Sequence, residues 1–289
     1  MADQVRSPFQ KIDLLELNAP LAKQKFMEVL DNYIKSAPNS QNALDIFKGE
    51  WASMFPGSVS LAAGTVPLFE DNRVAWAIEK FNGVHSKHIV EFGPLEAGHT
   101  YMLEKHGAAS IIAIEANSRA YLKCLIVKEV MELQKAHFLY GDCVEYLRTS
   151  PRKFDVCLAS GILYHMANPV ELISLIAKAS DQVFIWTHYY DGDIIHNQPH
   201  LSPKFPAQVA TEYEGFKHTL YRQEYQIALD YAGFCGGSSA FSHWLSREDI
   251  LSCLKYFGLT EIQINFDQLD HANGPCFALV AMRPATSGS

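Results

Sequence analysis

Paired cysteines are missing from this chain of 289 residues. Its six cysteines include no C-x-x-C pair, and several stand inside apolar runs. Such spacing disfavours a disulfide framework or a zinc site and is typical of reduced thiols in a cytosolic protein. We therefore expect a cytoplasmic location and assign no metal ligands from the sequence.

Long apolar runs are also missing. No stretch approaches the ~18 consecutive apolar residues of a membrane span, and residues 1–17 contain no apolar segment typical of a signal peptide. The hydrophobic fraction is nevertheless 48%, which is ample for a sizeable core. The composition excludes a wholly disordered chain and predicts no membrane partner.

Positive charge is scarce. Lysine and arginine number 24 against 32 aspartate and glutamate residues, which gives a formal net charge of −8. Proteins that bind nucleic acids usually concentrate positive charge, so this balance disfavours a nucleic-acid partner, although it leaves a local basic patch open. The oligomeric state, including a homo-oligomer, stays open as well.

Residues 1–86 read differently from the rest and predict an N-terminal helical extension that acts as a lid or flank. Leu21 to Lys35 carries apolar residues on one helical face, and Asp71 is placed to cap a second helix. From residue 87 to 283, short apolar runs alternate with helical patterns, which predicts βαβ units and a parallel sheet. The expected strands are 88–92, 110–115, 136–140, 154–159, 182–187, 260–266 and 276–282.

The pattern lapses between residues 191 and 245, which we interpret as an insertion that caps a substrate site. Within it, residues 217–231 allow an amphipathic helix that would form a pocket wall. Regularity returns where Ser246 is placed to cap a helix that ends before Gly258. Residues 284–289 are expected to be a tail.

A glycine-containing turn follows the first strand. Glu91 lies near the end of that strand, and Gly93 and Gly98 in the turn would let the backbone approach a ligand closely. The turn is not G-x-G-x-x-G, because Pro94-Leu95-Glu96-Ala97 replaces a second early glycine. A dehydrogenase that binds pyrophosphate is therefore disfavoured.

Acidic residues also mark the ends of the next two strands. Glu115 is placed to accept hydrogen bonds from ribose hydroxyls, and Asp142 from an adenine amino group. Each acid taken alone is often only a helix N-cap. Three acids and two glycines at successive strand ends favour a site for an adenosine ligand.

On these residues the chain resembles the class I methyltransferases that depend on S-adenosylmethionine (SAM) and release S-adenosylhomocysteine (SAH). The resemblance covers about residues 87 to 283 and implies an α/β fold. That fold is a Rossmann-like, seven-stranded, mostly parallel sheet with an antiparallel C-terminal hairpin. It also implies the cofactor-binding residues, which are Glu91, Gly93, Pro94, Gly98, Glu115, Ala116, Asp142, Cys143, Ser160 and Gly161.

The loop after the fourth strand reads Gly161-Ile-Leu-Tyr-His165. It resembles a subgroup that includes the tRNA wobble-uridine carboxymethyltransferases and many small-molecule methyltransferases, in which this loop lies beside the transferred methyl group. His165 is a candidate general base, since an imidazole pKa near 6.5 suits proton removal at neutral pH. Tyr164 is a candidate for positioning the substrate. The alternative is that His165 caps the next helix or packs under the cofactor.

Polar aromatic residues leave the fifth strand and continue into the insertion. Because ligands lie at the carboxyl ends of parallel strands, we expect them to face the crevice. His188 is a further catalytic candidate, with a metal ligand as its less favoured role. The substrate-binding candidates are Tyr189, Arg222, Tyr225 and Trp244.

Three functions remain open. The favoured one is methyl transfer from SAM to an oxygen or nitrogen atom of a small molecule. The second is tRNA wobble-uridine modification, against which the acidic balance counts. The third is a non-catalytic protein that binds SAM.

Overall fold

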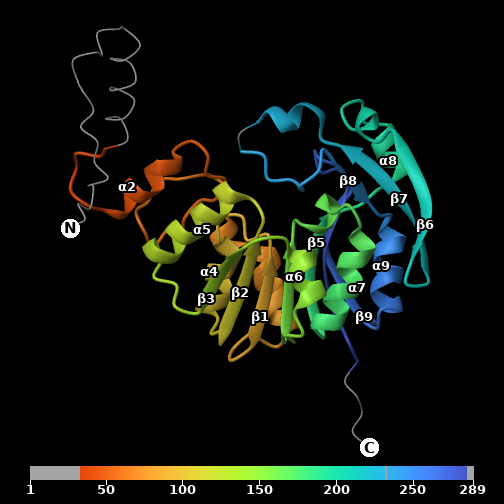
Figure 1. Cartoon of the computed structure of the whole chain (residues 1–289), viewed down its shortest axis with the longest axis horizontal. Coiled ribbons are helices and arrows are strands. Elements are labelled where there is room, and N and C mark those ends of the chain that lie inside the picture. The colour runs from red at the N-terminus through yellow and green to blue at the C-terminus, as the bar shows by residue number, and fades with distance from the viewer. Residues whose placement is uncertain (1–32, 232, 285–289) are drawn as a thin grey trace, which may run out of the picture.

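The computed structural model describes residues 33–231 and 233–284. Most of the predicted helix at 21–35, and the predicted tail apart from Pro284, lie outside these residues. No helix among the described residues is long and apolar enough to cross a membrane. The described chain forms a seven-stranded sheet covered by helices and a separate three-stranded sheet (Figure 1).

The large sheet has the strand order β3-β2-β1-β4-β5-β10-β9. The first five strands in this order are parallel to one another, and β10 is antiparallel to both β5 and β9. The fold predicted from the sequence is therefore confirmed. Its strands are β1 (His88–Phe92), β2 (Ser110–Glu115), β3 (Ala136–Tyr140), β4 (Val156–Ser160), β5 (Gln182–His188), β9 (Glu261–Gln268) and β10 (Cys276–Met282).

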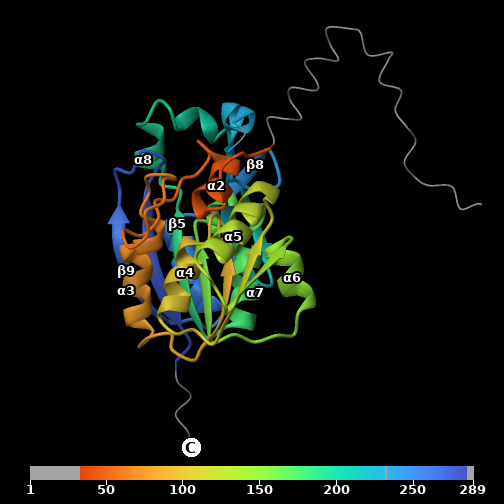
Figure 2. The same ribbon diagram turned by 90° about the vertical axis from the view of Figure 1, so that its left-hand side faces the viewer.

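The central strands of this sheet carry apolar residues on both faces, and helices cover both faces. On β1, for example, Ile89 packs among α3 and α4 residues, whereas Val90 packs with the cluster that includes α7 and α9. Figure 2 shows α3 and α4 on one side of the sheet and α6 and α7 on the other. The helices are α3 (Asn72–Lys80), α4 (Gly98–Lys105), α5 (Ser118–Val130), α6 (Cys143–Thr149), α7 (Pro169–Ala179) and α9 (Arg247–Tyr256).

Side-chain caps begin several of these helices where the sequence predicted them. Asp71 accepts a hydrogen bond from the Arg73 amide at the start of α3, and Ser246 accepts one from the Asp249 amide at the start of α9. Gly258 follows α9 with φ of 92°, a left-handed conformation that favours glycine. These local signals were readable because each depends only on neighbouring residues.

The segment before β1 packs directly against the large sheet. It contains α2 (Ser40–Leu44) and two short 3₁₀ turns, η2 (Asp45–Phe47) and η3 (Leu68–Glu70). Their buried aromatic residues share a cluster with α5 and β3, and α3 shares one with β1 and β4. This segment therefore flanks the crevice end of the sheet.

The segment from 191 to 245 forms the small antiparallel sheet, with strand order β6-β7-β8. The amphipathic helix that the sequence allows at 217–231 does not form, because residues 217–224 belong to β7 and residues 226–230 form a 3₁₀ turn. Phe216, His218 and Leu220 are buried and alternate with Lys217 and Thr219, which is the period of a strand. The elements are α8 (Gly192–His196), η5 (Ser202–Lys204), β6 (Ala207–Tyr213), β7 (Phe216–Glu224), η6 (Gln226–Asp230) and β8 (Phe241–Trp244).

Candidate cofactor and acceptor site

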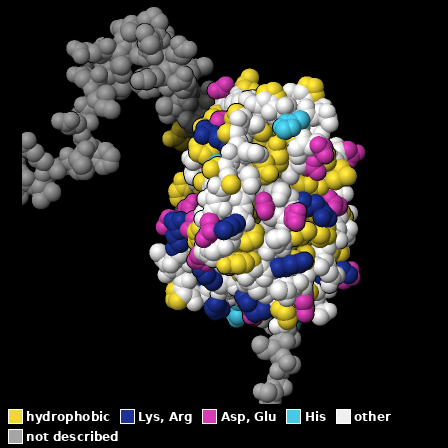
Figure 3. Space-filling model, turned by 90° about the vertical axis from the view of Figure 1, so that its right-hand side faces the viewer, with side chains coloured by type: hydrophobic (Ala, Val, Ile, Leu, Met, Phe, Trp, Pro, Cys, Tyr) yellow, Lys and Arg dark blue, Asp and Glu magenta, His cyan; other side chains and the backbone are white. Residues whose placement is uncertain are grey.

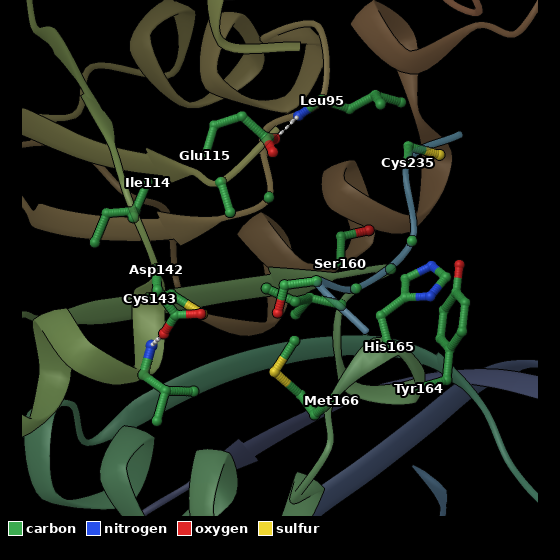
Figure 4. A pocket seen from close by; sticks show the side chains of 18 of the residues that line it. Leu95, Ile114, Glu115, Asp142, Cys143, Ser160, Tyr164, His165, Met166 and Cys235 are labelled. Atoms are coloured by element: carbon green, nitrogen blue, oxygen red, sulfur yellow. Dashed lines mark hydrogen bonds between the residues drawn. The ribbon is translucent and has the colours of Figure 1, made fainter. Parts of the chain in front are cut away.

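A cavity of about 580 Å³ opens at the carboxyl ends of the parallel strands (Figure 4). Ligand sites in proteins commonly have volumes of about 300–1,000 Å³. The sequence-predicted residues that line this cavity are Gly93, Pro94, Gly98, Glu115, Ala116, Asp142, Cys143, Ser160, Gly161, Tyr164 and His165. Residues from four separate strand ends thus meet around one space.

The turn after β1 is held in a strained conformation. Gly93 has φ of 64°, and Leu95 and Ala97, which are not glycines, have φ of 53° and 60°. Left-handed backbone at non-glycine residues costs free energy and persists only where surrounding contacts fix it. The free-energy cost of the left-handed Leu95 and Ala97 must therefore be offset by contacts that the turn makes with neighbouring segments.

Glu96 supplies those contacts. Its buried carboxylate accepts hydrogen bonds from the amides of Ala52 and Ser53 and from the Lys123 ammonium group, at 3.1, 2.7 and 2.8 Å. Lys123 also donates to the Glu50 carbonyl. Glu96, which stands between the two left-handed residues Leu95 and Ala97, thus ties the turn to the N-terminal segment and to α5.

Gly98 also has a packing role that the sequence analysis did not predict. A Cβ atom added there would lie 2.7 Å from the Leu68 carbonyl carbon, which cannot move without displacing η3. The glycine therefore permits close packing of η3 against the start of α4. Gly98 still lines the cavity, as does Leu68.

Glu91 does not line the cavity. It is 2% exposed and accepts a hydrogen bond from the Thr100 hydroxyl on α4. Burial raises the pKa of this carboxyl above its ordinary value, and the nearby His99 and the Thr100 hydrogen bond oppose that shift. Glu91 therefore joins the end of β1 to α4.

Glu115 and Asp142 lie at the ends of β2 and β3 and face the cavity (Figure 4). Glu115 accepts hydrogen bonds from the amides of Leu95 at 3.2 Å and Asn117 at 2.8 Å. Burial raises its pKa, which those amides partly oppose. Asp142 also caps α6, because its Oδ1 atom accepts from the amides of Val144 and Glu145. Asp142 is thus a helix N-cap, as the alternative interpretation held, and it also lines the cavity.

Arg73 and His99 also line the cavity, and the sequence analysis did not single them out. Both bind Asp71, with His99 Nε2 2.9 Å and Arg73 Nη2 2.6 Å from its Oδ2 atom. Burial would raise the pKa of Asp71, but hydrogen bonds from His99 and Arg73 outweigh it and hold the pKa well below its usual range. The arginine lies 15 residues before β1, so no motif around the strands indicated it.

His165 lies in the 3₁₀ turn η4 (Leu163–His165), at the end of the cavity opposite Glu115 and Asp142 (Figure 4). Burial, and to a smaller degree His188, lowers its pKa to about 3, so the imidazole is neutral at pH 7. Its Nδ1 atom lies 2.8 Å from the Tyr225 hydroxyl group. Tyr164 packs beside it, with ring centroids 4.1 Å apart.

Further hydrogen bonds lie around Tyr225 and in the small sheet. The Tyr225 hydroxyl oxygen accepts from the Gly237 amide at 3.2 Å. Ser242 donates to Gln223 Oε1 at 3.2 Å, and Gln223 Nε2 donates to the Glu224 carbonyl at 3.2 Å. Tyr225 therefore contacts His165 rather than the cavity itself.

The other expected substrate residues lie outside the cavity lining. Tyr189 is 1% exposed, packs on Phe277 and hydrogen-bonds Asp267. Arg222 pairs with Glu224 and lies over the Phe241 ring. These roles were assigned by proximity in the sequence, but successive residues of a strand point to opposite faces.

His188 and Trp244 also lie away from the cavity lining, behind Tyr164. Trp244 is buried and stacks on the His188 ring, with centroids 5.3 Å apart. The His188 ring lies 4.8 Å from that of Tyr164, which does line the cavity. The two residues thus support the wall of the cavity rather than form it.

A loop from the insertion closes the cavity. Residues 235–239 line it, and Phe241 follows them. A Cβ atom at Gly237 would lie 2.4 Å from the His165 carbonyl oxygen, so glycine lets this loop pass against η4. Asn117 donates to the Phe234 carbonyl at 3.0 Å and joins the loop to the end of β2. The Gly-Gly pair at 236–237 was the sequence signal for this approach.

Several solved structures share the fold of this chain. The N-terminal domain of EvdMO1, crystallised with SAH and D-fucose, is 21% identical with a TM-score of 0.63, over 85% of this chain and 95% of that domain. Magnesium protoporphyrin IX methyltransferase from Synechocystis PCC 6803, with SAH bound, is 12% identical with a TM-score of 0.51, over 92% and 95%. The chain has the class I methyltransferase fold. The N-methyltransferase NodS from Bradyrhizobium japonicum WM9 agrees, at 14% identity and a TM-score of 0.50, over 86% and 100%.

Comparison with curated sequences gives a shorter match. A tRNA U34 carboxymethyltransferase from Campylobacter hominis is 24% identical over 119 residues, which is 40% of this chain and 41% of that protein. The chain thus matches less than half the length of this curated relative. No family model matches the sequence.

Proposed function

We propose that this protein transfers a methyl group from SAM to an oxygen or nitrogen atom of a small molecule. The observation that carries the proposal is the convergence of Glu115, Asp142 and the Gly93 turn on one end of a cavity that has His165 at its other end. Such a site places a donor and an acceptor side by side and excludes water. Methyl transfer from an activated sulfonium needs little more.

The strand-end acids fit an adenosine ligand. We assign the ribose hydroxyls to the Glu115 carboxylate, which faces the cavity between the ends of β2 and β3. Both cap hydrogen bonds of Asp142 are made by Oδ1, and we assign the adenine amino group to Oδ2. Ala116 and Cys143, which also line the cavity, would contact the adenosine.

The amino-acid end of the cofactor fits the Gly93–Gly98 turn. The Arg73 guanidinium and the His99 ring line the cavity on this side. Arg73 Nε and Nη2 already donate to Asp71, so we assign the cofactor carboxylate to the remaining Nη1 atom. Asp71 orients both groups. Ser160 and Gly161 lie at the end of β4, where the sulfonium would sit beside η4.

The role of His165 depends on the direction of its hydrogen bond to Tyr225. A general base needs an unprotonated nitrogen that faces the acceptor. His165 meets this need when its Nδ1 atom donates to the Tyr225 oxygen, because the neutral ring then has an unprotonated Nε2. We assign this tautomer to His165 as part of the proposal.

The low pKa of His165 is compatible with this role. Before transfer the cavity would hold a sulfonium cation, and after transfer a neutral thioether and an imidazolium cation. The net charge of the site is then unchanged, so the cost of burying a charged imidazole is offset by the loss of the sulfonium charge. His165 would remain neutral until the methyl group moves.

Tyr225→Phe should lower kcat by about threefold to tenfold, the effect of losing one orienting hydrogen bond. KM for SAM should stay near its wild-type value, because Tyr225 does not line the cavity. Steady-state kinetics with SAM and acceptor varied separately would measure both. Tyr231→Phe removes the hydroxyl of a 63%-exposed tyrosine nearby and should change neither constant.

The proposal is tested by cofactor binding followed by turnover. Calorimetry should detect SAM and SAH, and SAH release should appear with an acceptor drawn from a screen. Sugars are the first class to include, because EvdMO1 was crystallised with D-fucose. Absence of SAM binding would refute the assignment. Binding without turnover on any acceptor would favour a non-catalytic protein.

A tRNA substrate is the second candidate, favoured by the match to the U34 carboxymethyltransferase. The face that bears β6, β7 and α9 mixes basic and acidic side chains (Figure 3), which does not favour a long phosphate contact there. If tRNA is bound, its affinity should fall steeply between 50 and 200 mM salt. Salt-independent or undetectable binding in filter assays would remove this candidate.

A further inference from the structure

Three side chains with metal-binding atoms meet behind the wall of the cavity. His188 ends β5 and Cys276 begins β10, and the two residues are directly paired across the antiparallel strands. His271 comes from the turn that joins β9 to β10. One ligand atom from each residue lies within 4.8 Å of the others. The strand pairing brings His188 and Cys276 together without a sequence motif.

The His188 ring is already oriented as a metal ligand would be. Its Nδ1 atom lies 2.8 Å from the Gly274 carbonyl oxygen, which only accepts, so Nδ1 carries the ring proton and Nε2 presents a lone pair. Ligand histidines usually donate their second nitrogen to a carbonyl or carboxylate in this way. Stacking on Trp244 holds the ring plane.

Cys276 contributes a buried sulfur. Its Sγ atom donates to Gln268 Oε1 at 3.9 Å. A thiol loses its proton when it binds a divalent cation, so metal binding would replace this contact. Sulfur with imidazole nitrogen is a donor set suited to Zn²⁺.

His271 is half-exposed, and its Nδ1 atom accepts a hydrogen bond from the Asn273 amide at 3.1 Å. Ligation by this ring exchanges that contact for a metal bond, and the exposed amide can then bond to water. At separations of up to 4.8 Å, the three atoms are farther apart than the ligands of a tetrahedral zinc. The turn between β9 and β10 must therefore move toward β5 for all three to bind one ion.

We propose that His188, His271 and Cys276 bind one zinc ion, with water in the fourth position. This site is separate from the cofactor cavity but touches its wall, since the His188 ring packs against Tyr164 and Trp186. The ion would fix the β9–β10 turn to the end of β5. It would thereby stiffen the acceptor side of the cavity.

Cobalt(II) is the probe for the test, because a thiolate ligand gives it a charge-transfer band in the near ultraviolet. Chelator-treated full-length protein titrated with Co²⁺ should show this band, saturate at one equivalent, and lose the band when Zn²⁺ is added. No SAM is present, so the outcome is independent of the proposed methyl transfer. Absence of the band in the wild-type protein would overturn the proposal.

Two variants and a control identify the ligands. Cys276→Ser should abolish the charge-transfer band, whereas Cys253→Ser, at another buried cysteine on α9, should leave it unchanged. His271→Ala, at a half-exposed turn residue, should weaken metal affinity by at least about tenfold. If Cys276→Ser does not fold, the His271 variant decides alone. An unchanged affinity there, or a band that survives in a folded Cys276→Ser, contradicts the site.

Discussion

Replacing Glu115 with alanine should weaken SAM binding by about 10- to 100-fold. The carboxylate would accept hydrogen bonds from the ribose hydroxyls, and hydrogen bonds to charged groups are worth about 1.5–3 kcal/mol each. The residue is only 8% exposed and lies at the junction of β2, the Gly93–Gly98 turn and α5. Isothermal titration calorimetry with SAM and SAH would measure the change.

Two further variants separate binding from folding in this experiment. Glu115→Gln keeps an oxygen acceptor and the shape of the side chain, so its loss should be smaller than that of Glu115→Ala. Glu129→Ala, at an exposed position near the end of α5, should bind SAM as the wild type does. Wild-type affinity in a folded Glu115→Ala would remove the ribose assignment.

Replacing His165 with alanine should lower kcat by about 100- to 10,000-fold, the usual contribution of a general base. The affinity for SAM should change by no more than about twofold, because His165 lies at the acceptor end of the cavity rather than at the adenosine end (Figure 4). Single-turnover measurements of SAH formation, at saturating acceptor, would isolate this step.

The acceptor atom decides how strong the effect is. A hydroxyl acceptor must lose a proton as it is methylated, whereas an amine already deprotonated needs no base. His137→Ala, an exposed histidine on β3, is the matched control and should keep the wild-type rate. A wild-type rate in His165→Ala would show that the residue has no role in proton removal.

Much of the fold was readable because its signals are local. The runs 88–92 and 110–115 match β1 and β2 residue for residue. Buried parallel strands are short and apolar throughout, and polar residues or glycine bound them on either side. The strand-end acids could be placed for the same reason, since parallel strands present their carboxyl ends at one edge.

The small sheet was misread because its signal is weaker. Residues 217–231 carry aromatic residues that fit a helix as well as a strand over short windows, and the alternation of buried and exposed positions in β7 covers only half of that range. The partner strands β6 and β8 decided the outcome by pairing with it. Short apolar segments of this kind take their conformation from their neighbours.

The sequence by itself thus determined the class of fold, the order along the chain of the strands of the large sheet, and the acids and glycines at the strand ends. Only the tertiary structure brought Arg73 and His99 together on Asp71. Only the tertiary structure paired His165 with Tyr225, buried Glu91 against Thr100 of α4, and placed His188 opposite Cys276. The physical reason is range: periodicity and capping depend on residues a few positions apart, whereas these contacts join segments that meet only when the chain packs.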